Sequence, residues 1–288
     1  YVVVSIPTSH TVGKIERPRF LHAELNEVAK NHVMLIRIEE RNRTDFINEL
    51  NGDLDTKNDT AFVFVHGYCN TFADAARRTA QMAEDIHRDM IPIMFSWPSK
   101  GSPKQYFNDD QAARAAASRL EAFLEMLAMQ TNVKHIHLIA HSMGNEVLTA
   151  ALAHMARAGS PASQSAKLEE TILAAPDVDK DVFEYAVSHI KSIVRRVTTY
   201  VSSQDLALTA SHAFRKSSYR AGDTLPQPLV IPNVETVDIS NMNCDLLGHS
   251  YVGNNRHVLN DIHSIFKGEA PAKRFGIRAK GKYWIFAP

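Results

Sequence analysis

Residues 138–145 read Leu-Ile-Ala-His-Ser-Met-Gly-Asn and join an apolar run directly to a segment of helical period. Small residues stand two positions before and two positions after Ser142, at Ala140 and Gly144. A sharp turn from a buried strand into a helix needs small residues there, because larger side chains would collide with the neighbouring strands. The segment therefore predicts a strand–turn–helix unit that lifts the Ser142 hydroxyl above the edge of a sheet.

The same alternation of short apolar runs and helical segments continues on both sides of this unit. It predicts a mostly parallel central sheet of about eight strands with helices on both faces. The expected strands are residues 1–7, 32–38, 61–65, 92–97, 135–140, 171–175, 196–201 and 234–239. The expected helices are residues 43–58, 72–88, 108–130, 143–157, 179–191, 204–213 and 255–267. Without a linker or an internal repeat, we expect one domain over 1–288, with a core of about 1–268 and a C-terminal extension of about 269–288.

Composition excludes several other classes of protein. The 32 basic residues balance 32 acidic ones, so the basic excess of a typical nucleic-acid-binding domain is missing. The apolar runs span about five to eight residues, far below the roughly 20 of a transmembrane helix. The 2 cysteines form neither a disulfide framework nor a zinc motif. We expect a soluble chain whose compartment is left open, since it begins at Tyr1 rather than Met.

The turn at Ser142 matches the nucleophile-elbow pattern, with Ala140 in place of the first glycine. A serine at the start of a helix is often only its cap, but its position after a buried strand favours a nucleophile. The backbone N–H of Met143 could then stabilise an oxyanion. A second donor is expected in the segment after strand 61–65, from the N–H of Tyr68 or Cys69. Its alternative is a plain strand-end turn with a structural His66.

A serine nucleophile needs a base and an orienting carboxylate, in the chain order serine, acid, histidine. His249 follows the last expected strand, and we assign it as the base. Asp205 follows strand 196–201 and is the preferred acid, whereas Asp177, which follows strand 171–175, is the alternative acid. Asp179 is expected to cap the helix that begins near residue 180. This chemistry requires no metal and no organic cofactor.

Five ordered motifs together resemble the bacterial α/β-hydrolases of domain-of-unknown-function family nine hundred. They are HGY at 66–68, FSWPS at 95–99, LIAHSMGN at 138–145, AAPDVD at 174–179 and LGHSY at 247–251. The resemblance covers about residues 1–268. It implies an α/β-hydrolase fold and serine-hydrolase chemistry, with Ser142, Asp205 and His249 in the triad positions. The sequence departs from the family pattern at Cys69, where the family usually carries Asn.

These features predict an esterase or a lipase-like enzyme that cleaves small or polymeric carboxylic esters through an acyl-enzyme. The alternatives are an acyltransferase or amidase with the same triad, and a non-catalytic binding protein on a hydrolase scaffold. The short segment 176–195 leaves no room for a large cap domain, so the loops at 98–107 and 214–233 are expected to wall an open site. Cys69 and Cys244 are expected to be free thiols, with a disulfide as the alternative if the chain is exported.

Overall fold

The computed structural model describes residues 1–18, 26–56, 59–86, 89–165, 167–205, 219–224, 227–242 and 251–286. Within them, an eight-stranded sheet has the strand order β4-β3-β5-β6-β7-β8-β10-β9. Every neighbouring pair in it is parallel except β9 and β10. The strands are β3 (Thr60–Val65), β4 (Ile91–Phe95), β5 (His135–His141), β6 (Leu168–Ala174), β7 (Arg196–Val201), β8 (Glu235–Asp238), β9 (Ile277–Lys280) and β10 (Tyr283–Phe286).

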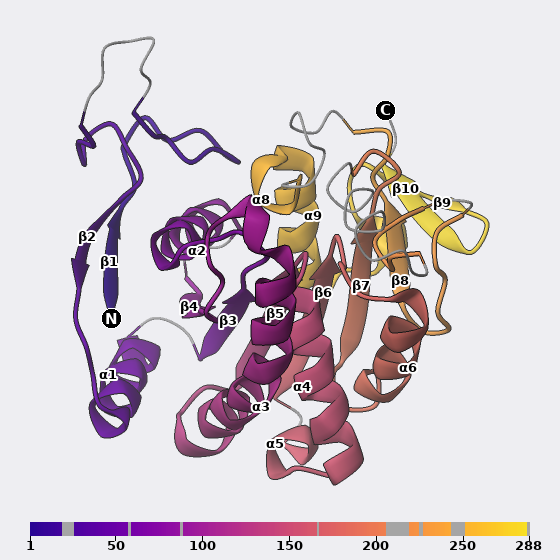
Figure 1. Cartoon of the computed structure of the whole chain (residues 1–288), viewed down its shortest axis with the longest axis horizontal. Helices are drawn as coiled ribbons and strands as arrows, with labels where there is room; N and C mark the ends of the chain where they lie inside the picture. Colours follow the sequence, from indigo (N-terminus) through magenta and orange to yellow (C-terminus); the bar gives the residue numbers. More distant parts are fainter. Residues whose placement is uncertain are drawn as a thin grey trace.

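Helices cover both faces of this sheet (Figure 1). The helices of the described residues are α1 (Arg43–Thr56), α2 (Phe72–Ile86), α3 (Tyr106–Gln130), α4 (Gly144–Ala158), α5 (Pro161–Gln164), α6 (Lys180–Ile190), α8 (Tyr251–Asn254) and α9 (Arg256–Phe266), with the short 3-10 turns η2 (Pro103–Gln105) and η3 (Pro271–Lys273). The predicted architecture, a mostly parallel sheet between two helical layers, is confirmed. The predicted helix at 204–213 lies largely outside the described residues.

Two separate clusters of buried apolar residues join the strands to the helices, one cluster on each face of the sheet. Successive side chains of a strand point to opposite faces, so Val63 and Val65 of β3 pack with α3, α4 and α6, while Phe62 and Phe64 pack with α2 and α9. All six residues of β3 are buried, as expected for a central strand covered on both faces. The rigid centre of the molecule is therefore the group of strands from which the serine turn emerges.

The first two predicted strands exist but do not join the central sheet. β1 (Val2–Ser5) and β2 (Met34–Ile38) pair antiparallel as a two-stranded sheet of their own. Figure 1 shows this sheet (indigo) standing apart from the eight-stranded one. Ile36 and Ile38 are 51% and 56% exposed, so their side of the small sheet is not covered by a helical layer. The C-terminal strands β9 and β10 bring the central sheet to eight instead.

Candidate active site

The turn between β5 and α4 has the geometry of a nucleophile elbow. Ser142 lies in the left-handed region with φ of 53°, and its N–H donates to the carbonyl oxygen of Ala174 at 3.0 Å. A Cβ added at Gly144 would lie 2.5 Å from the carbonyl oxygens of both Val65 and His66. Only glycine fits there, because the turn passes directly over the end of β3. Ser142 is thus held at the start of α4, where the first N–H groups have no acceptor within the helix.

The segment after β3 lies against this turn and holds the predicted second oxyanion donor. A Cβ added at Gly67 would lie 2.8 Å from Ser142 Cβ and 3.0 Å from the carbonyl oxygen of His141. We call residues 67–70 the oxyanion loop. Its Cys69 N–H donates to Asp109 Oδ2 at 3.3 Å. Of the two candidate donors, the geometry therefore favours the Tyr68 N–H over the Cys69 N–H.

His66 has the environment of a structural side chain. Its Nδ1 lies 2.9 Å from the carbonyl oxygen of Gly67, and its Nε2 lies 3.1 Å from that of Trp97. The imidazole stacks on the Trp97 ring at a centroid distance of 5.0 Å. Burial lowers the pKa of His66, which favours the neutral imidazole at pH 7. The ring therefore ties the end of β3 to the segment after β4.

Strand register brings the two candidate acids to the edge of the sheet that holds Ser142. His141 pairs with Ala174 of β6, and Ala174 pairs with Tyr200 of β7. The carboxyl ends of these adjacent parallel strands are therefore aligned. Asp177 follows β6 and Asp205 follows β7 within a few residues, so both acids lie on the ligand-binding side of the sheet.

Asp177 is held by two buried side chains. Its Oδ1 lies 3.1 Å from Arg220 Nε, and its Oδ2 accepts a hydrogen bond of 2.7 Å from the Tyr106 hydroxyl. Its N–H donates to the carbonyl oxygen of Ser142 at 3.3 Å. A carboxylate engaged in this way is suited to holding the loop after β6 in place. Nearby, Asp179 caps α6 by accepting from the N–H groups of Asp181 and Val182, which confirms its predicted role.

Asp205 is only 2% exposed and follows a turn that is fastened on two sides. The N–H of Ser202 donates to the carbonyl oxygen of Gly222 at 3.0 Å. The N–H of Ser203 donates to Ser240 Oγ at 2.8 Å. The turn is thereby joined to the segment after β8, which leads toward His249. His249 and Cys244 lie outside the described residues, and Cys69 is a free thiol.

The two loops predicted to wall the site contact the elements around Ser142. Within 98–107, the carbonyl oxygen of Pro103 accepts a hydrogen bond from the Tyr68 hydroxyl, and Ser99 Oγ accepts one from the N–H of Asn70. In the described part of 214–233, Gly222 N–H donates to the carbonyl oxygen of Pro176. The described parts of both loops thus flank the carboxyl edge of the sheet. Between β6 and β7, where the chain is described without a gap, it forms a single helix, α6.

Sequence reasoning missed three polar side chains that support this site. Asp109, Tyr106 and Arg220 are all buried, and each bonds to a loop that carries a candidate site residue. Asp109 had one visible signal, since an acidic residue in the first turn of a helix is common beside a helix dipole. Nothing in the sequence pattern indicated that its partner would be the oxyanion loop.

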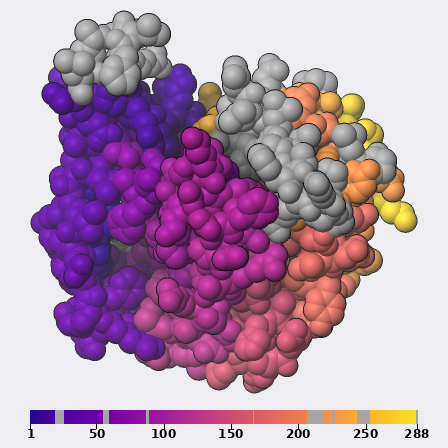
Figure 2. Space-filling model, in the orientation of Figure 1, coloured from indigo at the N-terminus to yellow at the C-terminus, as the bar shows by residue number. Residues whose placement is uncertain are grey.

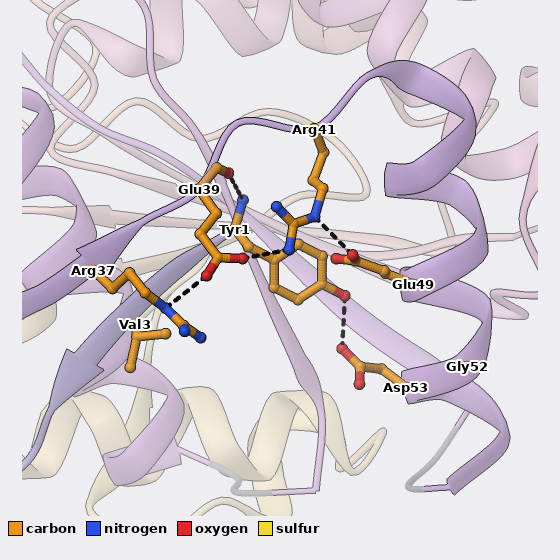
Figure 3. Close-up of a pocket in the computed structure, with 8 residues that line it drawn as sticks. All are labelled: Tyr1, Val3, Arg37, Glu39, Arg41, Glu49, Gly52 and Asp53. Atoms are coloured by element: carbon orange, nitrogen blue, oxygen red, sulfur yellow. Dashed lines mark hydrogen bonds and ion pairs between the residues drawn. The ribbon is translucent and has the colours of Figure 1, made fainter.

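A separate surface pocket of about 370 Å³ lies between the N-terminal strands and α1 (Figure 3). Charged side chains pair with one another across it, with Arg41 bound to both Glu39 and Glu49. The Tyr1 hydroxyl donates to Asp53 at 3.0 Å. The pocket contains none of the predicted site residues, and both of its arginines are paired with its glutamates. We therefore place the candidate active site at Ser142 and not here.

The sheet, its helical layers and the Ser142 turn define an α/β-hydrolase. Residues 39–265 match the family described as alpha/beta hydrolase of unknown function (DUF900). The chain belongs to this family, as the sequence motifs predicted. A comparison with curated proteins finds no match. Among the described residues, no helix is long and apolar enough to cross a membrane.

Solved structures that resemble the chain include several esterases. The Pyrococcus furiosus esterase Pf2001 is 13% identical with a TM-score of 0.43, over 73% of this chain and 83% of that one. The LpqC poly(3-hydroxybutyrate) depolymerase from Bordetella parapertussis is 17% identical with a TM-score of 0.42, over 74% of this chain and 80% of that one. A Trichoderma reesei cutinase is 12% identical with a TM-score of 0.29, over 52% of this chain and 84% of that one.

Proposed function

We propose that the protein is a serine hydrolase that cleaves carboxylic esters through an acyl-enzyme. The single observation that carries the proposal is the strained Ser142 turn, packed against Gly67 of the oxyanion loop at the end of a buried strand. Strained backbone of this kind persists where the surrounding structure enforces it, and it clusters at functional sites. An ordinary helix cap needs neither the positive φ nor the contact with a second loop.

In the proposed mechanism, Ser142 Oγ attacks the ester carbonyl while His249 takes the hydroxyl proton. The backbone N–H groups of Met143 and Tyr68 stabilise the oxyanion, which collapses as His249 returns the proton to the departing alcohol. Water then attacks the acyl-enzyme by the same steps and releases the carboxylic acid. Asp205 orients His249 and stabilises its charged form, as the carboxylate of such a triad does.

The test uses a fluorophosphonate probe and a panel of p-nitrophenyl esters of increasing acyl length. We expect the probe to modify Ser142, as identified by peptide mass spectrometry, and Ser142→Ala to abolish both labelling and ester hydrolysis. Circular dichroism and a thermal melt show whether the variant keeps its fold. A folded wild-type protein that neither reacts with the probe nor cleaves any ester would instead be a non-catalytic binding protein.

A further control separates hydrolysis from acyl transfer. The products of each cleaved ester are analysed with water alone and with added alcohol or amine acceptors. A hydrolase releases mainly the free acid in both cases, because water is its acyl acceptor. Predominant formation of a new ester or amide would identify an acyltransferase with the same catalytic serine and would contradict the hydrolase assignment.

A further inference from the structure

Asp109 lies in the first turn of α3 and is completely buried. Its Oδ2 accepts hydrogen bonds from Ser99 Oγ at 2.6 Å and from the Cys69 N–H at 3.3 Å. Its Oδ1 accepts a hydrogen bond from the Lys100 N–H at 2.7 Å. Burying a carboxylate is costly unless its oxygens are well bonded, and these three donors from two loops meet that requirement. The side chain thus joins the oxyanion loop to the loop after β4.

The peptide group between Tyr68 and Cys69 is held at both ends. Asp109 accepts from its N–H, and the side-chain amide of Asn70 donates to its carbonyl oxygen at 2.8 Å. Rotation of this peptide would break both hydrogen bonds at once. The orientation of this peptide is therefore held by two side chains, of which only Asp109 comes from another element.

The backbone at Cys69 needs such support because its φ is 59°. A left-handed conformation is unfavourable for an L-residue other than glycine, because its Cβ crowds the backbone. Without the bond to Asp109, the loop would gain freedom to relax into an unstrained conformation. Relaxation there would move the Tyr68 N–H, one residue away, from the position where an oxyanion would form.

We propose that Asp109 is a positioning residue for catalysis, which fixes the oxyanion loop through the Cys69 N–H. It touches no substrate and transfers no proton. Its effect is to hold the Tyr68 N–H in place before the reaction begins, so that no reorganisation is needed in the transition state. This inference rests on the proposed ester hydrolysis at Ser142.

The test compares Asp109→Asn with the matched control Asp110→Asn. Asparagine has the same shape, but an NH2 group replaces one of the two carboxylate oxygens. This group cannot accept a hydrogen bond, so the donors bound to that oxygen lose their acceptor. The neighbouring Asp110 carboxylate instead lies 3.6 Å from Arg114 on the same helix. The measurements are kcat and KM with p-nitrophenyl butyrate, and the inhibition constants of phenylboronic acid and of butyrate.

Loosening one oxyanion donor should act on the tetrahedral state alone. For Asp109→Asn we expect kcat to fall about 10- to 100-fold, somewhat less than the outright loss of a donor. The inhibition constant of phenylboronic acid, which forms a tetrahedral adduct with the serine, should rise by a similar factor. KM should stay within about threefold of the wild type, because acylation and deacylation both pass through an oxyanion and slow together. The inhibition constant of butyrate should also stay within about threefold, because butyrate forms no tetrahedral adduct. Asp110→Asn should match the wild type throughout.

Two results would overturn the inference while the wild type remains active. One is unchanged kcat and boronate affinity, and the other is an equal weakening of butyrate and boronate binding, which indicates general damage to the site. If Asp109→Asn does not fold, Ser99→Ala is the variant that tests the inference. It removes the hydroxyl that donates to Asp109 and accepts from the Asn70 N–H. It should produce the same pattern with a smaller loss. A wild-type protein inert to probe and esters refutes the proposed function itself, and the inference with it.

Discussion

Three residues with strained backbone lie at the carboxyl edge of the sheet. Cys69, Ser142 and Ala175 have positive φ values of 59°, 53° and 46° in the segments that follow β3, β5 and β6. None is glycine, so each position costs on the order of 1–3 kcal/mol. The strain is compensated by the packed strands beneath. Its concentration around Ser142 supports the placement of the proposed site better than any single motif.

At the residue scale, Gly67→Ala tests how closely the oxyanion loop must approach the serine. The new methyl group would stand 2.8 Å from Ser142 Cβ, and the loop would have to move outward. We expect kcat for ester hydrolysis to fall about 100-fold or more, the typical effect of losing one oxyanion donor.

The matched control is Gly52→Ala in α1, where an added Cβ meets nothing within 4 Å. It should leave kcat unchanged and raise the free energy of unfolding by about 0.5–1 kcal/mol, because alanine is favoured over glycine within a helix. Steady-state kinetics and urea unfolding measure both effects. A Gly67→Ala variant with wild-type kcat would show that the loop does not need this contact.

At the scale of elements, the parallel strands determine which groups can meet. β3, β5, β6 and β7 are neighbours, so the segments that follow them form one continuous border. The two candidate acids differ in which strand precedes them. The segment after β6 is already fastened by the pair between Asp177 and Arg220, whose side chains are 4% and 1% exposed.

This difference predicts opposite effects for two amide substitutions. Asp205→Asn should lower kcat by about 10⁴-fold with little change in stability, as expected for the acid of a triad. Asp177→Asn should instead reduce the free energy of unfolding by about 3–5 kcal/mol, because it removes the carboxylate from the buried ion pair with Arg220. The measurements are kcat per fluorophosphonate-reactive site and urea unfolding. The reverse pattern would assign the triad acid to Asp177.

At the scale of the whole molecule, the N-terminal segment is fastened to the hydrolase core through α2. In Figure 2 this segment (indigo) lies along one side of the molecule. His10 Nδ1 lies 2.9 Å from Glu16 and His10 Nε2 lies 3.0 Å from Asp85 of α2. Burial alone would lower the pKa of His10, but the hydrogen bonds with Glu16 and Asp85 outweigh it and raise this pKa. Burial alone would raise the pKa of Glu16, but the hydrogen bonds with the Thr11 N–H and with His10 outweigh it and lower this pKa.

The sign of the pH dependence follows from these directions. The His10 contribution is complete below its unfolded pKa of about 6.5, and it is lost as the pH rises through the higher folded pKa. The Glu16 contribution is present above its unfolded pKa of about 4.3, and it is lost as the pH falls through the lower folded pKa. His10→Gln should therefore lower the free energy of unfolding more at pH 6 than at pH 9.

Urea unfolding of both proteins at the two pH values gives the comparison. The control is His154→Gln, whose partner Glu121 lies 2.8 Å away but whose own side chain is 59% exposed. Solvent screens such a pair, so its effect should be small at both pH values. If the effect of His10→Gln does not change with pH, the raised pKa of His10 in the folded protein is contradicted.

The sequence predicted features that depend on neighbouring residues far better than contacts between residues that are distant in the chain. The strand–helix alternation, the Ser142 turn and the Asp179 cap depend on residues close together in the chain. The separation of β1 and β2 from the central sheet depends on pairing, which periodicity does not encode. The link from Asp109 to Cys69 joins residues 40 positions apart, so no spacing rule reveals it.

The two outer strands of the central sheet determine whether the sheets of two protein molecules can pair edge to edge. An exposed strand edge is a template for pairing with another chain, and proline or charged side chains discourage such pairing. β4 at one edge carries Pro92, which lacks a backbone N–H. β9 at the other edge exposes Arg278 and Lys280. Because β9 and β10 cover β8, the central sheet ends on each side in a strand whose residues disfavour edge-to-edge pairing with another copy of the protein.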